Sequence, residues 1–478
     1  MVLSAKPPLV VDLDGTLSPA DTLIEALISL LLRLPGEIAG VLKALLRGRS
    51  AMKAHMASLA IYGKALPLRA DFLAYLEAEK AAGRELHLAT AADQSVADAI
   101  AGRVGLFTSA IGSSDGVNLK GRRKMEALAR KFPNGFSYAG NDRADLRIWS
   151  VAESMVFVNV DRATKGKAMR LGKPVERDFP REALPLKTWL RAIRIHQWSK
   201  NVLLFVPLLL AHKYDDVPSV LTVLAGFVAL GCVASGTYLI NDLSDLDADR
   251  MHKSKCNRPL ASGAISAGAG FVTALILIVG GLASSVMIAQ AFAVTVGAYI
   301  CLTLAYSLHF KKVPMVDVFV LGMLYTLRIL MGMMLIGAQP SPWLLSFSMF
   351  FFFSLSMAKR HVEIVRAGGG ANLDEFIKGR GYKASDAPLS LSFGVASSVA
   401  AILILFLYIV NEAYPIALYR EPQWLWCIGF LVFLWTLRIW LLSHRGELDD
   451  DPVAFALKDP SSLFIGLLVL AVFGLATV

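Results

Sequence analysis

A cluster of carboxylates near the middle of the chain is the strongest chemical signal in this sequence. The run Asn241-Asp-Leu-Ser-Asp-Leu-Asp-Ala-Asp-Arg250 holds four aspartates within eight residues and follows directly on the apolar run Val220–Ile240. Clustered negative charge at the end of a membrane-embedded helix is costly unless it is compensated. Oxygen ligands of this kind suit Mg²⁺, which often shares its coordination with substrate phosphates. The cluster therefore predicts a membrane enzyme that acts on phosphates, rather than a transporter or a lipid-binding scaffold.

The spacing of these aspartates favours a shared metal site. If a helix continues through the cluster at about 100° per residue, Asp242, Asp245 and Asp249 fall within a sector of roughly 60°, whereas Asp247 points elsewhere. Three carboxylates on one helix face are a suitable ligand set for Mg²⁺. The alternative is an exposed loop with acidic helix caps. We expect the metal site, because such loops rarely follow an apolar span with this spacing.

Several polar and basic residues near the predicted membrane helices could bind the phosphates of a substrate. Arg258 could bridge phosphate oxygens bidentately or could only set the membrane topology. Asp317 could complete a second metal position or hold a hydroxyl group. Arg328 lies within a predicted span, so we expect it to be functional or paired with a carboxylate. The predicted substrate- and phosphate-binding residues of this part of the chain are Lys200, Asn241, Arg258, Tyr306, Lys311, Asp317, Arg328, Lys359 and Arg360.

A second acidic motif lies close to the N-terminus. Val10-Val-Asp-Leu-Asp-Gly-Thr-Leu17 places Asp12 and Asp14 directly after a short apolar run. One carboxylate of such a pair can attack phosphorus while the other acts as general acid and base. The groups that could join this pair are the Thr90 hydroxyl, the ammonium of Lys124 or Lys120, and the run Gly140-Asn-Asp-Arg-Ala-Asp145.

The elements that carry this second motif alternate between strands and helices. We predict strands at 8–11, 84–92, 136–139 and 155–160, and helices at 65–82 and 121–131. This alternation indicates an α/β domain with a parallel sheet. The apolar stretches Thr22–Leu34 and Ile38–Leu46 interrupt the pattern; they predict either a helical cap on the membrane surface or a buried helix pair.

The rest of the chain is dominated by apolar segments. A linker rich in Pro and charge precedes nine predicted membrane helices, at roughly 198–212, 217–242, 267–287, 290–309, 314–336, 342–360, 389–410, 423–443 and 461–477. Lys and Arg gather in the loops after the even-numbered helices, including the long predicted loop 359–386. The positive-inside rule then places those loops and the N-terminal domain in the cytoplasm.

Composition agrees with a largely membrane-embedded protein. The 478 residues are 55% hydrophobic and 18% charged, with a mean hydropathy of +0.54. The net charge of +10 fits cytoplasmic loops and phosphate binding. We do not expect nucleic acid as a partner, because no basic stripe is interleaved with aromatic residues. The four cysteines are scattered, so we expect reduced packing residues.

The acidic motif and its neighbours resemble the UbiA superfamily of membrane prenyltransferases, over roughly residues 185–478. The residues that carry the resemblance are Asn241-Asp-x-x-Asp-x-x-x-Asp249, Tyr306, Lys311 and Asp317. His196-Gln-Trp-Ser-Lys-Asn201, Arg258-Pro-Leu-Ala-Ser-Gly263 and Tyr325-Thr-Leu-Arg328 are similar to its decaprenyl-phosphate phosphoribosyltransferase branch. The resemblance implies an all-α, nine-helix membrane bundle. It also implies transfer of 5-phosphoribose from phosphoribosyl diphosphate to a polyprenyl phosphate, with Mg²⁺ on Asp242, Asp245 and Asp249.

Residues 1–175 resemble the haloacid dehalogenase (HAD) superfamily of phosphatases. The resemblance implies a Rossmann-like parallel sheet with a helical cap, Asp12 as nucleophile, Asp14 as general acid and base, and Thr90 and Lys124 at the phosphate. The implied Mg²⁺ ligands are Asp12, Asp14, Asn141 and Asp145. Family members usually have Gly-Asp where this chain has Gly140-Asn141. That Asn removes a formal charge; Asp142 could replace it after a small register shift, or the domain could be a phosphate-binding or structural remnant.

The resulting prediction is a membrane protein with two catalytic parts. A HAD-like phosphatase domain would occupy residues 1–175, a linker 176–190 and a UbiA-like transferase domain 191–478. The phosphatase would remove the 5-phosphate from the phosphoribosyl lipid. The alternative is transfer of a prenyl chain from a prenyl diphosphate to an aromatic or other acceptor. The sequence leaves open the lipid chain length and whether the chain forms a homo-oligomer.

Overall fold

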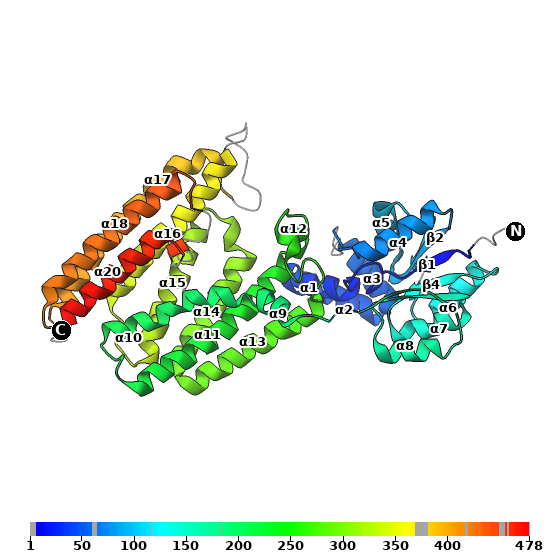
Figure 1. The fold of residues 1–478 in the computed structure, drawn as a ribbon, viewed down its shortest axis with the longest axis horizontal. Helices are drawn as coiled ribbons and strands as arrows, with labels where there is room; N and C mark the ends of the chain where they lie inside the picture. Colours follow the sequence, from blue (N-terminus) through cyan, green and yellow to red (C-terminus); the bar gives the residue numbers. More distant parts are fainter. Residues whose placement is uncertain are drawn as a thin grey trace. The chain divides into compact units, whose positions relative to one another are not determined.

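The computed structural model describes residues 6–59, 65–114, 116–181, 183–368, 381–415, 419–448, 455–456 and 458–477. It divides into two compact units, whose elements Figure 1 labels. Unit 1 comprises Met1–Ile193 and Leu239–Ala274, and unit 2 comprises Arg194–Tyr238 and Leu275–Val478. The segment that carries the acidic cluster belongs to the same compact unit as the N-terminal domain, and the linker at 176–190 stays a prediction.

The sheet of unit 1 has six strands in the order β3-β2-β1-β4-β5-β6, and every pairing is parallel. Leu9 of β1 lies opposite Leu86 of β2 on one side and Ser137 of β4 on the other. The four predicted strands are confirmed; β3 and β6 were not predicted, since β3 is only half-buried at its start and β6 carries charged residues. The strands are β1 (Leu9–Val11), β2 (Leu86–Asp93), β3 (Ser109–Ser113), β4 (Ser137–Gly140), β5 (Ser154–Val158) and β6 (Val175–Phe179).

Helices connect these strands. The Asp21 side chain accepts a hydrogen bond from the Ile24 N–H and so caps the N-terminus of α1, a position where Asp is favoured. The helices of the N-terminal part are α1 (Thr22–Arg33), η1 (Pro35–Glu37), α2 (Ile38–Leu46), α3 (Arg49–Ser58), α4 (Ala70–Ala81), α5 (Gln94–Val104), α6 (Arg122–Lys131), η2 (Arg143–Asp145), α7 (Leu146–Val151), α8 (Arg162–Met169) and α9 (Leu186–Ala192). Helices α1–α3 form the insertion between β1 and β2 that was predicted as a cap.

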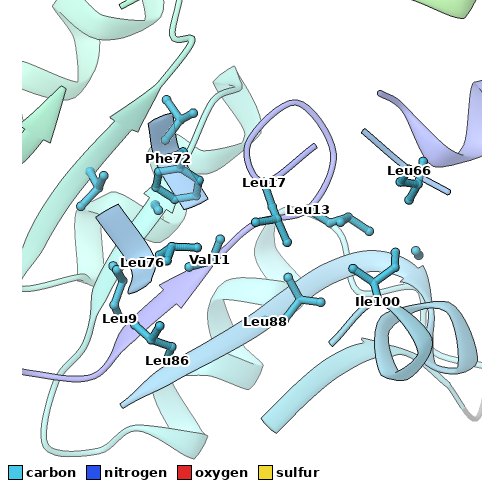
Figure 2. Close-up of a cluster of buried hydrophobic side chains, with 14 of the residues drawn as sticks. Leu9, Val11, Leu13, Leu17, Leu66, Phe72, Leu76, Leu86, Leu88 and Ile100 are labelled. Atoms are coloured by element: carbon cyan, nitrogen blue, oxygen red, sulfur yellow. The ribbon is translucent and has the colours of Figure 1, made fainter. Parts of the chain in front are cut away.

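A hydrophobic core fixes the central strands. Figure 2 shows side chains of β1 and β2 packed with Phe72 and Leu76 of α4. Leu9, Val11 and both helix residues have no exposed surface. Burying a side chain of this size stabilises a fold by roughly 1.5–3 kcal/mol. This packing holds the carboxyl end of β1, where Asp12 and Asp14 follow, in a fixed position.

The remaining elements are helical, as the predicted all-α membrane domain requires. They are η3 (Ile195–Phe205), α10 (Val206–Leu210), α11 (Val217–Ser244), α12 (Leu246–Arg250), η4 (Lys255–Asn257), α13 (Ala267–Ile288), α14 (Gln290–Leu308), η5 (Phe310–Lys312), α15 (Val316–Leu335), α16 (Pro342–Gly368), η6 (Ala384–Asp386), α17 (Ala387–Tyr408), η7 (Ile409–Ala413), η8 (Pro422–Trp424), α18 (Leu425–His444) and α20 (Pro460–Thr477).

Seven helices in the described part of the chain are long and apolar enough to cross a membrane, two fewer than the nine predicted. The predicted span 198–212 is a 3₁₀ segment followed by the short α10, which has Pro207 in its first turn. The predicted span 342–360 is α16, which runs to Gly368 and is not among the seven. The first part of α16 is apolar, but its last third carries Lys359, Arg360 and other charged residues, which lower the hydropathy of the whole helix.

Candidate active sites

The carboxyl edge of the sheet in unit 1 gathers most of the residues predicted for the phosphatase. Because β1 lies between β2 and β4, the segments after these strands meet at one edge, the usual ligand position in parallel sheets. A cavity of about 330 Å³ at this edge is lined by residues that include Asp12, Asp14, Lys124, Asn141 and Asp145. Thr90 lies buried within β2, where its hydroxyl accepts a hydrogen bond from the Ala92 N–H. Ser266, from the segment after the acidic cluster, also lines the cavity; the sequence alone gave no signal for it.

Asp12 and Lys124 form the centre of this cavity. The Lys124 ammonium donates to Asp12 Oδ1 at 2.7 Å, and the Leu13 N–H donates to the same oxygen at 2.8 Å. The Lys124 side chain is 5% exposed, so little water weakens the pair. Of the two lysines left open by the sequence, Lys124 is the one that contacts Asp12, while Lys120 is an exposed residue that also lines the cavity.

Asp14 has a different environment. Its Oδ1 accepts a hydrogen bond from the Thr22 N–H at 2.8 Å, where α1 begins. Burial raises the pKa of Asp14 to about 7, and the negative charges of Asp21 and Asp12 act in the same direction. A carboxyl group with a pKa near neutrality can both donate and accept a proton under physiological conditions. Asp14 therefore suits the acid/base role that was predicted for it.

The loop after β4 holds the Asp145 carboxylate in place through backbone hydrogen bonds. Asp145 accepts hydrogen bonds from the N–H groups of Asn141 and Asp142. Burial raises its pKa to about 6; Asp12 adds to this rise and Lys124 opposes it. The Asn141 side chain instead accepts from the Thr16 hydroxyl at 3.1 Å. Asp142 caps η2 from an exposed position and also lines the cavity, so its predicted substitution for Asn141 stays a prediction.

Gly15 allows this arrangement. Its φ of +75° lies in the left-handed region, and a Cβ at this position would lie 2.0 Å from the Asn141 amide nitrogen. Side chains with a Cβ rarely adopt such a backbone conformation. The glycine thus lets the loop after Asp12 and Asp14 pack directly against the loop after β4.

The acidic cluster is not one continuous helix, contrary to prediction. Helix α11 ends at Ser244, Asp245 lies at a break, and α12 begins at Leu246. Asp242 and Asp249 are nevertheless buried and converge on one nitrogen of Arg258, at 3.1 and 2.5 Å from its Nη1. Asp245 is half-buried, and Asn241 lies half-buried in the last turns of α11. Asp242 and Asp249 therefore share one cation position, and the predicted participation of Asp245 in the same site stays a prediction.

The sequence predicts Mg²⁺ at both groups of carboxylates. Among the described residues, no group of three or more His, Cys, Asp or Glu side chains is arranged to hold a metal ion. Asp242 and Asp249 still fit a cation, because the guanidinium of Arg258 already occupies the position between them. In the sheet cavity, Asp12 and Asp145 lie near the Lys124 charge. Each pair offers the hard oxygen ligands that Mg²⁺ takes when substrate phosphates supply the others.

Helix α1 of the cap holds the acidic cluster through two charged residues that sequence reasoning missed. The Arg33 guanidinium donates twice to the Ser244 carbonyl, at 2.9 and 2.6 Å, and once to Asp247 at 2.9 Å. Glu25 accepts two hydrogen bonds from Arg250, and the two side chains are only 8% and 3% exposed. The available signal was two charges on one face of an otherwise apolar helix.

The cap was predicted to be either a helix pair buried in the protein or a helical layer on the membrane surface, and α1 has features of both. The face of α1 that carries Glu25 is buried against the segment 244–250. The opposite face exposes Ile24, Leu27 and Leu31, each at 40–48%. The helix is partly a buried element, while its remaining apolar surface keeps the membrane-surface interpretation as a prediction.

In unit 2, Asp317 is the centre of a buried network. It forms an ion pair of 2.7 Å with Arg360, and it accepts a hydrogen bond of 2.7 Å from the Tyr382 hydroxyl. Arg360 also pairs with Glu363. Lys359 and Arg360 lie in α16 and not in the predicted loop 359–386, of which residues 369–380 lie outside the described part of the chain. Arg360 thus neutralises a carboxylate of its own chain, and its role as a phosphate ligand stays a prediction.

Arg328 is buried within α15 and donates several hydrogen bonds. It donates to the Asn201 side chain, the Leu324 carbonyl and the Tyr299 hydroxyl, at distances between 2.6 and 3.1 Å. The Lys200 ammonium lies 5.7 Å from the ring centre of Tyr325, which also contacts Arg328. The other predicted phosphate-binding residues of this unit are half-buried: Tyr306 in α14 and Lys311 in η5.

Comparison with known proteins agrees with these observations. The model of the UbiA prenyltransferase family matches residues 202–468. The uncharacterized protein y4nM of Sinorhizobium fredii is 45% identical over 98% of this chain and 91% of its own length. A decaprenyl-phosphate phosphoribosyltransferase of Corynebacterium glutamicum is 33% identical over 180 residues, which are 37% of this chain and 54% of that protein. The match thus spans about half the length of that relative.

Among solved structures, a UbiA homologue from Archaeoglobus fulgidus bound to GPP and Mg²⁺ aligns with 61% of this chain and all of its own, at 16% identity and a TM-score of 0.47. The family match covers more than half of the 478 residues and most of the apolar helices. Seven candidate spans and this match together identify an integral membrane transferase. The chain belongs to the UbiA prenyltransferase family.

Proposed function

We propose that the chain transfers 5-phosphoribose from phosphoribosyl diphosphate to a polyprenyl phosphate, and that the domain around Asp12 then removes the 5-phosphate. The observation that carries the first step is the convergence of Asp242 and Asp249 on Arg258. Two buried carboxylates and a guanidinium supply the charges that a metal-bound diphosphate needs. The similarity to a decaprenyl-phosphate phosphoribosyltransferase supports this choice of substrates.

In the transfer step, a phosphate oxygen of the lipid attacks C1 of the ribose, and the bond from C1 to the diphosphate breaks. Asp242, Asp245 and Asp249 would hold Mg²⁺, which neutralises the leaving diphosphate when it is bound. Arg258 can contact the same diphosphate, because its guanidinium already faces the two carboxylates. A phosphate anion is an adequate nucleophile, so the step requires no strong protein base. Positive charge at the leaving group is the main catalytic contribution.

The phosphatase step follows from the sheet cavity. Asp12 attacks phosphorus and forms an aspartyl phosphate, while Asp14 protonates the departing ribose oxygen. Water then attacks the aspartyl phosphate, Asp14 accepts a proton from that water, and Asp12 and phosphate are released. Lys124 stabilises the negative charge at Asp12 throughout, and the near-neutral pKa of Asp14 allows both proton transfers. The loop charges favour a cytoplasmic location for this domain.

Label transfer tests the proposal. The purified full chain in detergent is incubated with Mg²⁺, polyprenyl phosphate and phosphoribosyl diphosphate that carries ¹⁴C in the ribose and ³²P at the 5-phosphate. We expect both labels in the organic phase with Asp12→Asn, and ¹⁴C alone with the unaltered chain. Retention of ³²P by the unaltered chain contradicts the phosphatase step.

The family also includes enzymes for another reaction, the transfer of a prenyl chain from a prenyl diphosphate. A parallel incubation with labelled prenyl diphosphate and an aromatic acceptor tests this alternative. Absence of ribose label from the organic phase, together with a labelled prenylated acceptor, would refute phosphoribosyl transfer. Asp249→Asn serves as the control in both incubations, because it removes one of the two carboxylates at Arg258 without changing the size of the side chain.

A further inference from the structure

A large cationic depression adjoins the sheet cavity and has no role in the steps above. It has a volume of about 710 Å³ and is lined by six basic side chains, which we call the arginine basin: Arg49, Lys120, Arg122, Arg123, Arg143 and Arg147. They come from three places in the fold, namely the start of α3, the start of α6 and the segment η2–α7. Residues so distant in sequence gather here only because the chain folds them to the same edge of the sheet.

The positive charge of the basin is poorly compensated. Its described lining contains no Asp or Glu. Arg122 pairs with Glu126, but both side chains are largely exposed, at 78% and 40%, and exposed pairs contribute little. At the neighbouring Lys53, burial lowers the pKa; the carboxylates of Asp14 and Asp21 oppose this effect, and the charges of Lys120 and Arg49 add to it. A concave surface with this charge raises the local concentration of anions.

The basin is continuous with the nucleophile. Lys120, Gly121 and Ala144 line both the basin and the cavity that contains Asp12 and Asp14. A Cβ at Gly121 would lie 3.8 Å from Arg147 Nη1, so the Arg147 guanidinium reaches across to the start of α6. A molecule whose phosphomonoester lies at Asp12 can therefore extend past Gly121 into the basin.

We propose that the arginine basin binds a second phosphate group of the phosphatase substrate, so that the domain selects phosphomonoesters that carry another anionic phosphate. Arginine is suited to this role, since its guanidinium donates two parallel hydrogen bonds to phosphate oxygens. The proposal rests on the phosphatase activity proposed above and specifies its substrate class. The phosphoribosyl lipid belongs to this class, because it has a phosphomonoester at one end of the ribose and a phosphodiester at the other.

The experiment compares two soluble probes, ribose 5-phosphate and ribose 1,5-bisphosphate, with the full chain in detergent. We expect kcat/KM for phosphate release to be at least about tenfold higher for the bisphosphate, mainly through KM. The double variant Arg123→Gln/Arg147→Gln should bring the ratio of the two values close to one. The matched control Arg162→Gln/Arg170→Gln removes the same charge from two exposed positions outside the basin, the first residue of α8 and its C-cap, and should keep the preference. Equal values for both probes with the unaltered chain would overturn the proposal.

Binding separates this proposal from the phosphatase proposal. In the Asp12→Asn background, equilibrium dialysis of both probes should show at least tenfold tighter binding of the bisphosphate and loss of that difference in the basin variant. This result supports the basin even if no phosphate is released, whereas equal binding refutes it.

Anionic lipid head groups are the other source of phosphate. If phosphatidylglycerol nanodiscs, but not phosphatidylcholine nanodiscs, abolish the preference in the unaltered chain, the basin binds lipid head groups and the proposal is wrong.

Discussion

The sheet cavity and the acidic cluster both place buried aspartates beside basic side chains, but they leave those aspartates suited to different chemistry. Asp14 is held by a neutral backbone N–H, and burial brings its pKa to about 7. Asp242 and Asp249 face a guanidinium, which does not lose its proton in proteins. The first arrangement can move protons, while the second can only neutralise charge. The nearest donor therefore decides what a buried aspartate can do in this protein.

The largest expected effects test the independence of the two sites. Asp12→Asn removes the nucleophile and should lower phosphate release by at least about a thousandfold, while label transfer to lipid continues. Asp249→Asn should reduce label transfer by a similar factor and leave hydrolysis of ribose 5-phosphate intact. Both activities are measured on each variant in the same preparation. Loss of both activities in either variant would show that the two sites act as one.

The next largest effect should come from what we call the clamp, namely the contacts of Glu25 and Arg33 of α1 with the segment 244–250. Glu25→Gln leaves Arg250 buried without its counter-charge, which typically costs about 3–5 kcal/mol. Thermal unfolding of the full chain in detergent measures the loss. Asp178→Asn, which breaks the exposed pair with Lys165, is the control and should cost at most about 1 kcal/mol. Partial recovery in the exchange Glu25→Arg with Arg250→Glu would confirm that the pair, and not one residue alone, is responsible.

Arg258 allows the charge-neutralising role to be examined directly. Both aspartates contact the same nitrogen of Arg258, so a lysine ammonium can preserve part of the arrangement. We expect Arg258→Gln to reduce label transfer by about a hundredfold and Arg258→Lys by only about tenfold. Equal losses in the two variants would indicate that the geometry of the fork matters more than its charge.

The pH dependence of stability gives a further test in the sheet domain. Burial would raise the pKa of Glu176, but hydrogen bonds from Arg84, Ser137 and Ser154 outweigh it and lower the pKa from 4.5 to about 2. Since the folded value is the lower one, the stabilisation is fully present above pH 4.5 and is lost as the pH falls toward 2. Allowing for residual exposure, we expect roughly 2 kcal/mol. In Glu176→Gln, the change in unfolding temperature between pH 6 and pH 3 should shrink.

The smallest expected effect concerns the loop after β4. Asn141→Asp adds a formal charge beside Asp12 and Asp145 and should lower the Mg²⁺ concentration required for half-maximal phosphate release by a few-fold, since a carboxylate is a stronger Mg²⁺ ligand than an amide. The Thr16 hydroxyl can donate to the new carboxylate as it does to the amide. An unchanged Mg²⁺ requirement would mean that position 141 serves only the packing of the loop against Gly15.

Local patterns were sufficient to predict much of the fold. The apolar runs predicted β1, β2, β4 and β5, and the stretch Thr22–Leu34 predicted α1 almost to the residue. β6 was missed because it lies at the sheet edge, where charged side chains replace the apolar run. The break at Asp245 was also missed, because a periodicity argument assumes that a helix continues.

The candidate sites divide in the same way. Asp12, Asp14 and Lys124 were predictable because short motifs at strand ends meet at one edge of a parallel sheet. The pairing of Asp317 with Arg360 was not, since it joins two helices whose mutual packing no local pattern specifies. Arg33 and Glu25 contact residues more than 200 positions away in sequence. Contacts at such a separation follow no residue periodicity, so they could not be predicted from a single sequence.

The clamp on Ser244 and Arg250 has a consequence for attempts to divide the protein. Cleavage in the segment 176–190, which resembles a natural domain boundary, would leave the N-terminal fragment without the partners of Glu25 and Arg33. The complementary fragment would keep Arg250 with no carboxylate from α1 and a helix end with no capping guanidinium. Neither half would be self-sufficient, so co-expression of the two pieces, rather than separate production, is the appropriate route to studying them individually.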